Sequence, residues 1–288
     1  MTVVWAGLAV GAVYALIAIG YNITLTFGGT FNFAHGALVV LAGFFSWFFM
    51  IELGWPWWLA ALLGAVLCAV VAVLEERIAI RPVMRHLDSH ALLVTTVGAL
   101  VIIEGVLLAT WGHEPHAVPF FGGQEAFDFL GGRVSPVDLW LIVVAIVVGV
   151  GFHFFARRSL WGVSARAATG DPDNARVRGI NISALRTASF ALAGGIAGLL
   201  GPIVVPKTGA SVAVLITLTV FGFVALALGG FGSFIGALIG GFAIGLIQSF
   251  GARYLGVEFP PLLLFVVLLL VLLFIPSGLL GRRAVREV

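Results

Sequence analysis

Four long stretches of the chain carry no charged side chain. No Asp, Glu, Lys or Arg occurs in 1–51, 53–74, 187–206 or 208–252. A helix needs about 20 apolar residues to cross a bilayer, so each stretch allows one crossing, and the first and last allow two. Because 61% of the residues are hydrophobic and only 10% are charged, the sequence predicts an integral membrane protein.

The apolar segments predict an all-α, polytopic fold with about nine transmembrane helices, within a range of roughly eight to ten. At 27–36 the sequence Phe27-Gly28-Gly29-Thr30 fits either a tight cytoplasmic turn or a helix broken within the membrane. Residues 1–288 are expected to form a single transmembrane domain. The expected spans are 3–26, 32–50, 57–76, 91–110, 137–156, 184–204, 211–229, 234–252 and 259–276.

Basic residues are concentrated between particular spans. Twelve of the 15 Lys and Arg residues lie in 77–85, 157–186 and 282–286. Basic loops stay on the cytoplasmic side, so nine crossings place the N-terminus outside the cell and the C-terminus in the cytoplasm. These clusters flank apolar spans and lack interleaved aromatic residues, so they do not indicate nucleic-acid binding.

Several small motifs argue against redox, metal or hydrolytic chemistry. The single cysteine, Cys68, cannot form an internal disulfide or a C-x-x-C site. The outer loop 111–136 contains His113-Glu114-Pro115-His116, and two histidines without further ligands are weak evidence for a metal. That loop is expected to be an irregular cap. No H-E-x-x-H helix is present, so an intramembrane hydrolase is disfavoured, and no cofactor or metal is predicted.

The cytoplasmic loop 157–183 is the longest polar stretch and is expected to form two short helices. Asp171 would cap the second helix, with Pro172 at its first position, Arg176 near its negative end and Gly179 just beyond it. A helix of about seven residues is not stable alone. The loop is therefore either a solvated linker or an element that docks against a partner.

Glycines recur at a spacing of four residues within the apolar segments. Such small-xxx-small pairs let two helices approach closely in a membrane. The sequence therefore predicts close helix crossings at Gly7/Gly11, Gly194/Gly198, Gly236/Gly240 and Gly241/Gly245.

A family resemblance covers nearly the whole chain. In the cytoplasmic loop it rests on Arg166-Ala167, Asp171, Ala175 and Gly179-Ile180-Asn181. Further blocks in the same order are Gly7-Leu8, Tyr14-Ala15-Leu16, Phe31-Asn32-Phe33-Ala34-His35-Gly36, Arg81-Pro82, Thr95-Thr96-Val97-Gly98, Gly229-Gly230-Phe231-Gly232-Ser233, Gly236-Ala237 and Pro276-Ser277-Gly278-Leu279. Together they resemble LivH-type permeases, the membrane subunits of branched-chain amino acid ABC importers. Phe31, Gly170 and the outer loop depart from the family pattern.

This resemblance implies a non-enzymatic permease subunit in the cell membrane of a prokaryote, importing branched-chain or related amino acids. It also implies a second, LivM-like permease subunit, two cytoplasmic ATP-binding subunits and an extracytoplasmic solute-binding protein. The chain has no G-x-x-x-x-G-K-[ST] loop, so ATP hydrolysis is expected on another polypeptide. Coupling to that ATPase is assigned to the loop 157–183 through Arg166, Ala167, Asp171, Ala175, Arg176 and Gly179.

The main alternative is an ion-coupled secondary transporter or a channel for a small polar solute. Such a protein normally needs ionisable groups at membrane depth, and Glu104 is the clearest one. A zwitterionic solute also needs polar contacts, although each polar residue could instead form an interhelical hydrogen bond. The solute itself is left open among leucine-like amino acids, other amino acids, urea and short amides. The candidate pathway residues are Asn22, Asn32, His35, Thr95, Thr96, Glu104 and Gln248.

Overall fold

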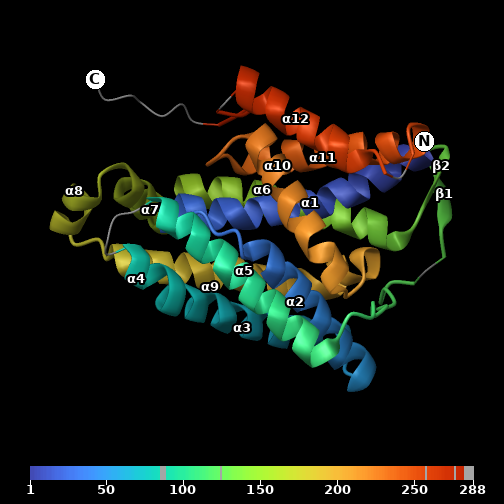
Figure 1. The fold of residues 1–288 in the computed structure, drawn as a ribbon, viewed down its shortest axis with the longest axis horizontal. Coiled ribbons are helices and arrows are strands. Elements are labelled where there is room, and N and C mark those ends of the chain that lie inside the picture. The colour runs from blue at the N-terminus through green and yellow to red at the C-terminus, as the bar shows by residue number, and fades with distance from the viewer. Residues whose placement is uncertain (85–88, 124, 257, 276, 282–288) are drawn as a thin grey trace. The chain divides into compact units, whose positions relative to one another are not determined.

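A computed structural model describes residues 1–84, 89–123, 125–256, 258–275 and 277–281. The described chain is dominated by helices (Figure 1). Three residues or segments used in the sequence predictions lie outside the described residues: Arg85, Pro276 and the basic segment 282–286.

Eight helical stretches in the described residues are long and apolar enough to cross a membrane, which confirms the polytopic helical prediction. A further apolar helix, α12 (Pro260–Phe274), has 15 residues. The eight stretches are α1 (Thr2–Gly28), α2 with the π-helical η1 (His35–Trp47, Phe48–Glu52), α3 with η2 and α4 (Trp57–Glu75, Glu76–Ile80, Arg81–Met84), α5 (Ser89–Trp111), α6 (Pro136–Arg158), α9 (Ile182–Thr208), η3 with α10 (Val212–Val214, Leu215–Gly229) and α11 (Phe234–Tyr254).

The ambiguous segment near Gly28 is a turn between two helices. α1 runs to Gly28, α2 begins at His35, and each is part of a stretch long enough to span a membrane. Gly29 has φ +67°, a conformation that favours glycine because it has no Cβ. We refer to residues 29–34 as the α1–α2 turn.

The chain divides into two compact units, which are described separately. Unit 1 comprises Met1–Asn22, Glu125–Phe155 and Val220–Val288, and unit 2 comprises Ile23–Gln124 and Ala156–Thr219. α1, α6 and α10 therefore each contribute residues to both units.

Close glycine contacts hold the helices of each unit together. In unit 2 a Cβ at Gly198 of α9 would lie 2.1 Å from the carbonyl oxygen of Gly64 in α3, and one at Gly194 would lie 2.4 Å from that of Cys68. In unit 1, α1 packs on α11 and α10 packs on α11 in the same way. The predicted crossings at Gly7/Gly11, Gly194/Gly198, Gly236/Gly240 and Gly241/Gly245 are confirmed.

The loop 111–136 contains a small β-hairpin, so the prediction that this loop is irregular was wrong in this part. Strands β1 (Phe127–Phe129) and β2 (Gly132–Val134) pair antiparallel, with Phe127 opposite Val134. Leu130 and Gly131 form the connection with φ values of 46° and 77°. Two consecutive residues with positive φ form a turn whose twist matches that of antiparallel strands. The pattern of apolar residues did not predict this local geometry.

Candidate functional site

The segment between α6 and α9 folds into two short capped helices, α7 (Leu160–Gly170) and α8 (Pro172–Val177). Ser159 accepts the Gly162 backbone N–H at 2.9 Å, and Asp171 accepts that of Asn174 at 3.0 Å. The hydrogen bonds from the backbone and the side chain of Asn174 hold the pKa of Asp171 below its ordinary value. The predicted pair of helices and the Asp171 cap are confirmed.

α8 ends at a glycine in the left-handed region. Gly179 has φ +84°, and the next residue, Ile180, donates its N–H to the carbonyl of Ala175 at 3.0 Å. Residues that carry a Cβ rarely adopt this conformation. Gly179 therefore sets the direction in which the chain leaves α8 toward α9.

A small hydrophobic core joins α7 and α8 to the start of α9. Its buried members are Ala168, Ala175 and Leu185, one from each helix. Because α8 is only six residues long, packing must stabilise it. Within the chain, α7 and the start of α9 supply this packing. Trp161, Ile180 and Ile182 pack against the same cluster.

α7 also contacts the end of α1. The ring of Trp161 stacks on Phe27, with centroids 5.3 Å apart and planes inclined by 19°. Two residues further on, a Cβ at Gly29 would lie in ordinary van der Waals contact, 3.5 Å, with Thr169 Cγ2. α7 is therefore packed against both the last turn of α1 and the first residue of the α1–α2 turn.

The opposite side of this segment is open. Leu160 and Val177 are each 87% exposed, although the segment lies outside the candidate spans. Arg176 pairs with Asp173 at 3.0 Å on the exposed surface. Single exposed aliphatic residues are common on protein surfaces, so their exposure leaves Leu160 and Val177 available to a partner without identifying one.

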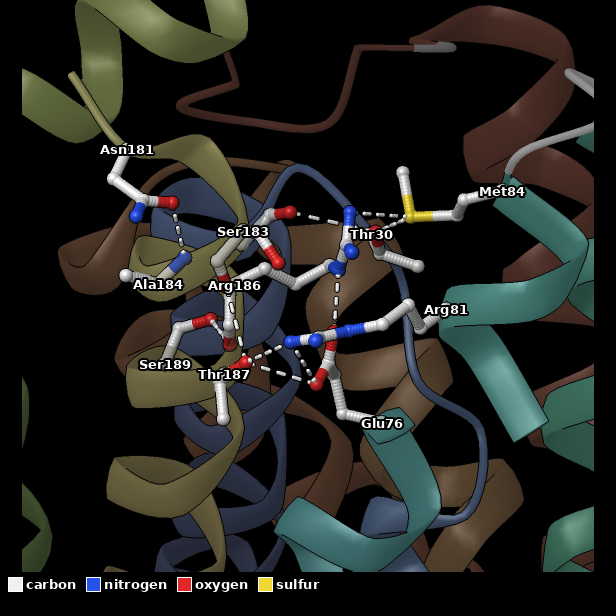
Figure 2. A network of polar contacts seen from close by, with 11 residues as sticks. Thr30, Glu76, Arg81, Met84, Asn181, Ser183, Ala184, Arg186, Thr187 and Ser189 are labelled. Atoms are coloured by element: carbon white, nitrogen blue, oxygen red, sulfur yellow. Dashed lines mark hydrogen bonds and ion pairs between the residues drawn. The ribbon is translucent and has the colours of Figure 1, made fainter. Parts of the chain in front are cut away.

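A buried ionic network connects α9 with the end of the α3 stretch (Figure 2). Arg186 Nε donates to Glu76 Oε1 at 2.9 Å, and the Thr187 hydroxyl donates to Oε2 at 2.9 Å. Arg81 donates to Glu76 at 3.3 Å and to the Thr187 hydroxyl at 2.8 Å. The Glu76 side chain is fully buried, so these donors replace the water that a carboxylate would otherwise bind.

The same network reaches the α1–α2 turn through a methionine. Figure 2 shows Met84 between Arg186 and Thr30. The Met84 sulfur accepts hydrogen bonds from the Arg186 guanidinium and from the Thr30 hydroxyl. A thioether is a weak acceptor, so this link positions the groups more than it stabilises them.

The preceding residue of α3, Glu75, contacts the α1–α2 turn directly. The amide of Asn32 donates to Glu75 Oε2 at 3.0 Å, while Asn32 Oδ1 accepts the Ala34 backbone N–H at 2.9 Å. Both Asn32 and Glu75 are buried. No described residue makes a hydrogen bond to the other carboxyl oxygen, Oε1.

The predicted pathway residues of unit 1 are engaged within that unit. The Asn22 amide donates to the Ser233 carbonyl and accepts the Gly232 N–H, both at 2.8 Å. Gln248 accepts a hydrogen bond from the Tyr14 hydroxyl at 2.6 Å. In this structure Asn22 braces the link between α10 and α11, and Gln248 joins α11 to α1.

The remaining pathway residues belong to unit 2. His35 is buried at the start of α2 and donates its backbone N–H to Asn32. Thr95 and Thr96 donate to carbonyls of their own helix, at 2.7 and 3.0 Å. Glu104 is half-buried on α5. Of the pathway residues in this unit, the α1–α2 turn brings Asn32 and His35 together.

The two histidines of the loop 111–136 differ from each other. His113 is exposed, whereas His116 stacks on Trp47 with centroids 4.0 Å apart and exchanges backbone hydrogen bonds with Ala210 at 2.9 Å. Among the described residues there is no group of three or more His, Cys, Asp or Glu side chains that could hold a metal. His116 thus connects its loop to α2 and to the link after α9.

Sequence reasoning missed the pair Glu75-Glu76. These residues follow the charge-free stretch 53–74 and precede the basic segment 77–85, and the sequence predictions gave neither of them a role. Two consecutive carboxyls at the end of an apolar helix were the available signal. Their partners, Asn32 on one side and Arg186 on the other, come from distant parts of the sequence.

Comparison with known proteins supports the sequence resemblance. A family model described as the permease component of a branched-chain amino acid transport system matches residues 3–275. The high-affinity branched-chain amino acid transport system permease protein LivH of Escherichia coli K12 is 29% identical over 301 residues, covering 98% of this chain and 96% of the relative. The corresponding protein BraD of Pseudomonas aeruginosa is 28% identical over 297 residues, with the same coverage.

A solved structure shares the fold. The structure described as PsaBC from Streptococcus pneumoniae in complex with Fab matches with a TM-score of 0.50 and 10% identity. The match covers 94% of this chain and 91% of that chain.

Proposed function

The chain belongs to the family of permease components of branched-chain amino acid transport systems. From this premise we propose that it is the membrane-spanning subunit of an ATP-driven importer of branched-chain or related amino acids. The α7–α8 segment carries the proposal, because it is packed on α1 and α9 yet exposes Leu160 and Val177. The chain has no phosphate-binding loop, so energy must arrive from another polypeptide.

The proposed assembly contains this chain, a second LivM-like permease subunit, two cytoplasmic ATP-binding subunits and an extracytoplasmic solute-binding protein. The relatives named above are permease proteins of transport systems, which supports an assembly of several subunits. Basic residues around 77–85 and 157–186 support an orientation with the N-terminus outside and the C-terminus in the cytoplasm.

The proposed coupling residues have two kinds of role. Asp171, Ala175 and Gly179 shape α8 through its cap, its buried contact and its left-handed end. Arg166 donates to carbonyls of Gly162 and Arg157 and so braces α7, while Ala167 and Arg176 are exposed. We assign the first set to the shape of the docking element and the exposed residues to the contact with the ATPase.

The proposed substrate pathway uses the polar groups at membrane depth, because a zwitterion crossing an apolar bundle needs hydrogen-bond partners. Asn32 and His35 are foremost, since Asn32 lies in the non-helical α1–α2 turn and His35 directly follows it. The further pathway residues are Asn22, Thr95, Thr96, Glu104 and Gln248.

Proteoliposomes holding the complete transporter test this proposal. With ATP inside the vesicles and the binding protein outside, wild-type protein should accumulate leucine. Ala175→Glu places a charge in the small core of α7, α8 and α9, and Gly179→Pro cannot adopt φ +84°, so both should abolish uptake while the protein still inserts.

Matched controls are Ala175→Ser and Gly179→Asn, because serine is small and asparagine tolerates the left-handed region. Both should retain uptake. Unchanged uptake by Ala175→Glu and Gly179→Pro would contradict the coupling role. Ion-driven uptake by the purified chain without ATPase subunits would instead support a secondary transporter.

A further inference from the structure

Two consecutive carboxyls at the end of the α3 helix differ sharply in their partners. Glu76 accepts hydrogen bonds from Arg81, Arg186 and Thr187. Glu75 accepts one from Asn32, and its Oε1 atom has no hydrogen-bond partner among the described residues. Because an ionised carboxylate offers about four acceptor positions, Glu75 is an incompletely satisfied acceptor.

The missing hydrogen-bond partner matters because the Glu75 carboxyl is buried away from water. Glu75 is only 8% exposed, and the two arginines of the neighbouring network are bound to Glu76. A buried carboxylate is costly unless a cationic group or further donors balance it, and without them the carboxyl takes up a proton. Glu75 lies roughly 27 Å along the helix axis from Trp57, near the far end of a hydrocarbon core of about 30 Å.

The side chain that covers Glu75 belongs to a segment that α7 contacts. Asn32 is 1% exposed, and its Oδ1 is held by the Ala34 N–H within the α1–α2 turn. The same turn begins at Gly29, which faces Thr169 of α7, directly after the stack of Phe27 on Trp161. α7 therefore lies against the turn that places Asn32 over Glu75.

We propose that Glu75 Oε1 is a binding position for an alkylammonium group, and that during transport it accepts the ammonium of the translocated amino acid. This assignment rests on the proposed import function. An ammonium has three N–H donors, so one can bind Glu75 while carbonyls of the non-helical α1–α2 turn accept the others. A metal ion fits less well, because the described residues hold no group of three or more potential ligands.

Protection from a hydrophobic carbodiimide measures binding at this position. The complete transporter in lipid nanodiscs is treated with dicyclohexylcarbodiimide, and modification of Glu75 is followed by peptide mass spectrometry. L-leucine and 3-methylbutylamine, which both carry an ammonium, should slow the modification several-fold, whereas 4-methylpentanoate, which lacks one, should not. Equal rates with all three compounds, or equal protection by 4-methylpentanoate, would overturn the assignment.

A matched pair of variants gives a second measurement. Glu75→Gln keeps an oxygen for the Asn32 amide but removes the charge, so leucine uptake should fall at least tenfold. Glu52→Gln changes an exposed carboxyl at the end of η1 and should leave uptake unchanged. Wild-type uptake by Glu75→Gln counts against the proposal, and if this variant does not fold, the protection rates in the wild-type protein decide.

The two proposals fail in different ways. If the wild-type transporter shows no ATP-dependent uptake of leucine or of related amino acids, the import function is wrong, and protection by 3-methylbutylamine still tests the ammonium position. If leucine is imported but neither compound protects Glu75, only the ammonium position is wrong.

Discussion

The indole ring of Trp161 stacks on the phenyl ring of Phe27, with centroids 5.3 Å apart and planes inclined by 19°. Trp161 is in the first turn of α7, and Phe27 is in the last turn of α1. This stack joins the segment proposed to receive the ATPase to a membrane helix by one side-chain contact. A rigid contact between two helices can transmit a displacement, because packed side chains resist compression.

Removing the Trp161 ring should uncouple the transporter. Trp161→Ala deletes a stack worth about 0.5–1.5 kcal/mol beyond its buried area, so α7 should move without displacing α1. We expect ATP hydrolysis to continue while leucine uptake falls several-fold in proteoliposomes. Trp161→Phe retains an aromatic partner for Phe27 and should keep most of the uptake; equal loss in both variants would argue against the stack as the transmitting contact.

The exposed aliphatic pair on α7 and α8 should be required for ATPase binding but not for folding. Leu160→Ser combined with Val177→Ser changes two side chains that are each 87% exposed. Surface changes of this kind usually alter stability by about 0.5 kcal/mol or less. The double variant should therefore keep its Tm but no longer co-purify with the ATP-binding subunits.

Leu130→Ser provides the matched control for this surface, because Leu130 is 73% exposed on the outer hairpin. It should co-purify normally. Retention of the ATPase by the Leu160 and Val177 double variant would show that the subunit docks elsewhere.

Breaking the ionic network at Glu76 should destabilise the protein strongly. Glu76→Ala leaves Arg186, itself only 8% exposed, without its carboxylate. Removing one partner of a buried ion pair typically costs about 3–5 kcal/mol, which corresponds to a fall in Tm of roughly 10 °C. The change is measured by thermal unfolding of the purified protein in detergent.

Two further variants separate this mechanism from a general packing defect. Arg81→Gln should cost about 1 kcal/mol or less, because its side chain is 33% exposed and solvent screens its charge. Adding Arg186→Met to Glu76→Ala removes the unpaired cation and should recover much of the lost stability. A double variant that is no more stable than Glu76→Ala would rule out the unpaired charge as the cause.

The glycine crossing between α3 and α9 should not tolerate a single methyl group. Gly198→Ala places a Cβ 2.1 Å from the Gly64 carbonyl oxygen, so the helices must separate. Overpacking of this kind costs about 1–3 kcal/mol. Gly98→Ala on α5 is the control, because a Cβ there meets nothing within 4 Å and alanine favours a helix by roughly 1 kcal/mol. Comparable Tm values for the two variants would contradict a close crossing.

Features that depend on a few neighbouring residues were predictable from the sequence. The capped helix at Asp171, the left-handed Gly179 and the small-residue crossings all appear in the structure, because capping and close approach depend on local residue types. The β-hairpin after Phe127 was missed, since three-residue strands leave almost no periodic pattern.

The candidate site could be predicted only in part. The sequence pointed to Asn32 and His35 because they are polar residues next to a glycine-rich turn, and the structure places Asn32 against a buried carboxyl. It did not identify that carboxyl, Glu75, or the adjacent network. Glu76 and Arg186 are 110 residues apart in the chain. A single sequence does not show which distant residues lie close together in space.

The sequence by itself determined that this protein crosses a membrane several times. A helix needs about 20 apolar residues to cross a bilayer, so the charge-free stretches locate the spans, except for the boundaries within 1–51 and 208–252. Only the tertiary structure decided which sides of those helices face one another, because helices that are apolar all around carry no amphipathic pattern to orient them. For the same reason only the tertiary structure showed that Glu76 is fully compensated by arginines whereas Glu75, its neighbour, is not.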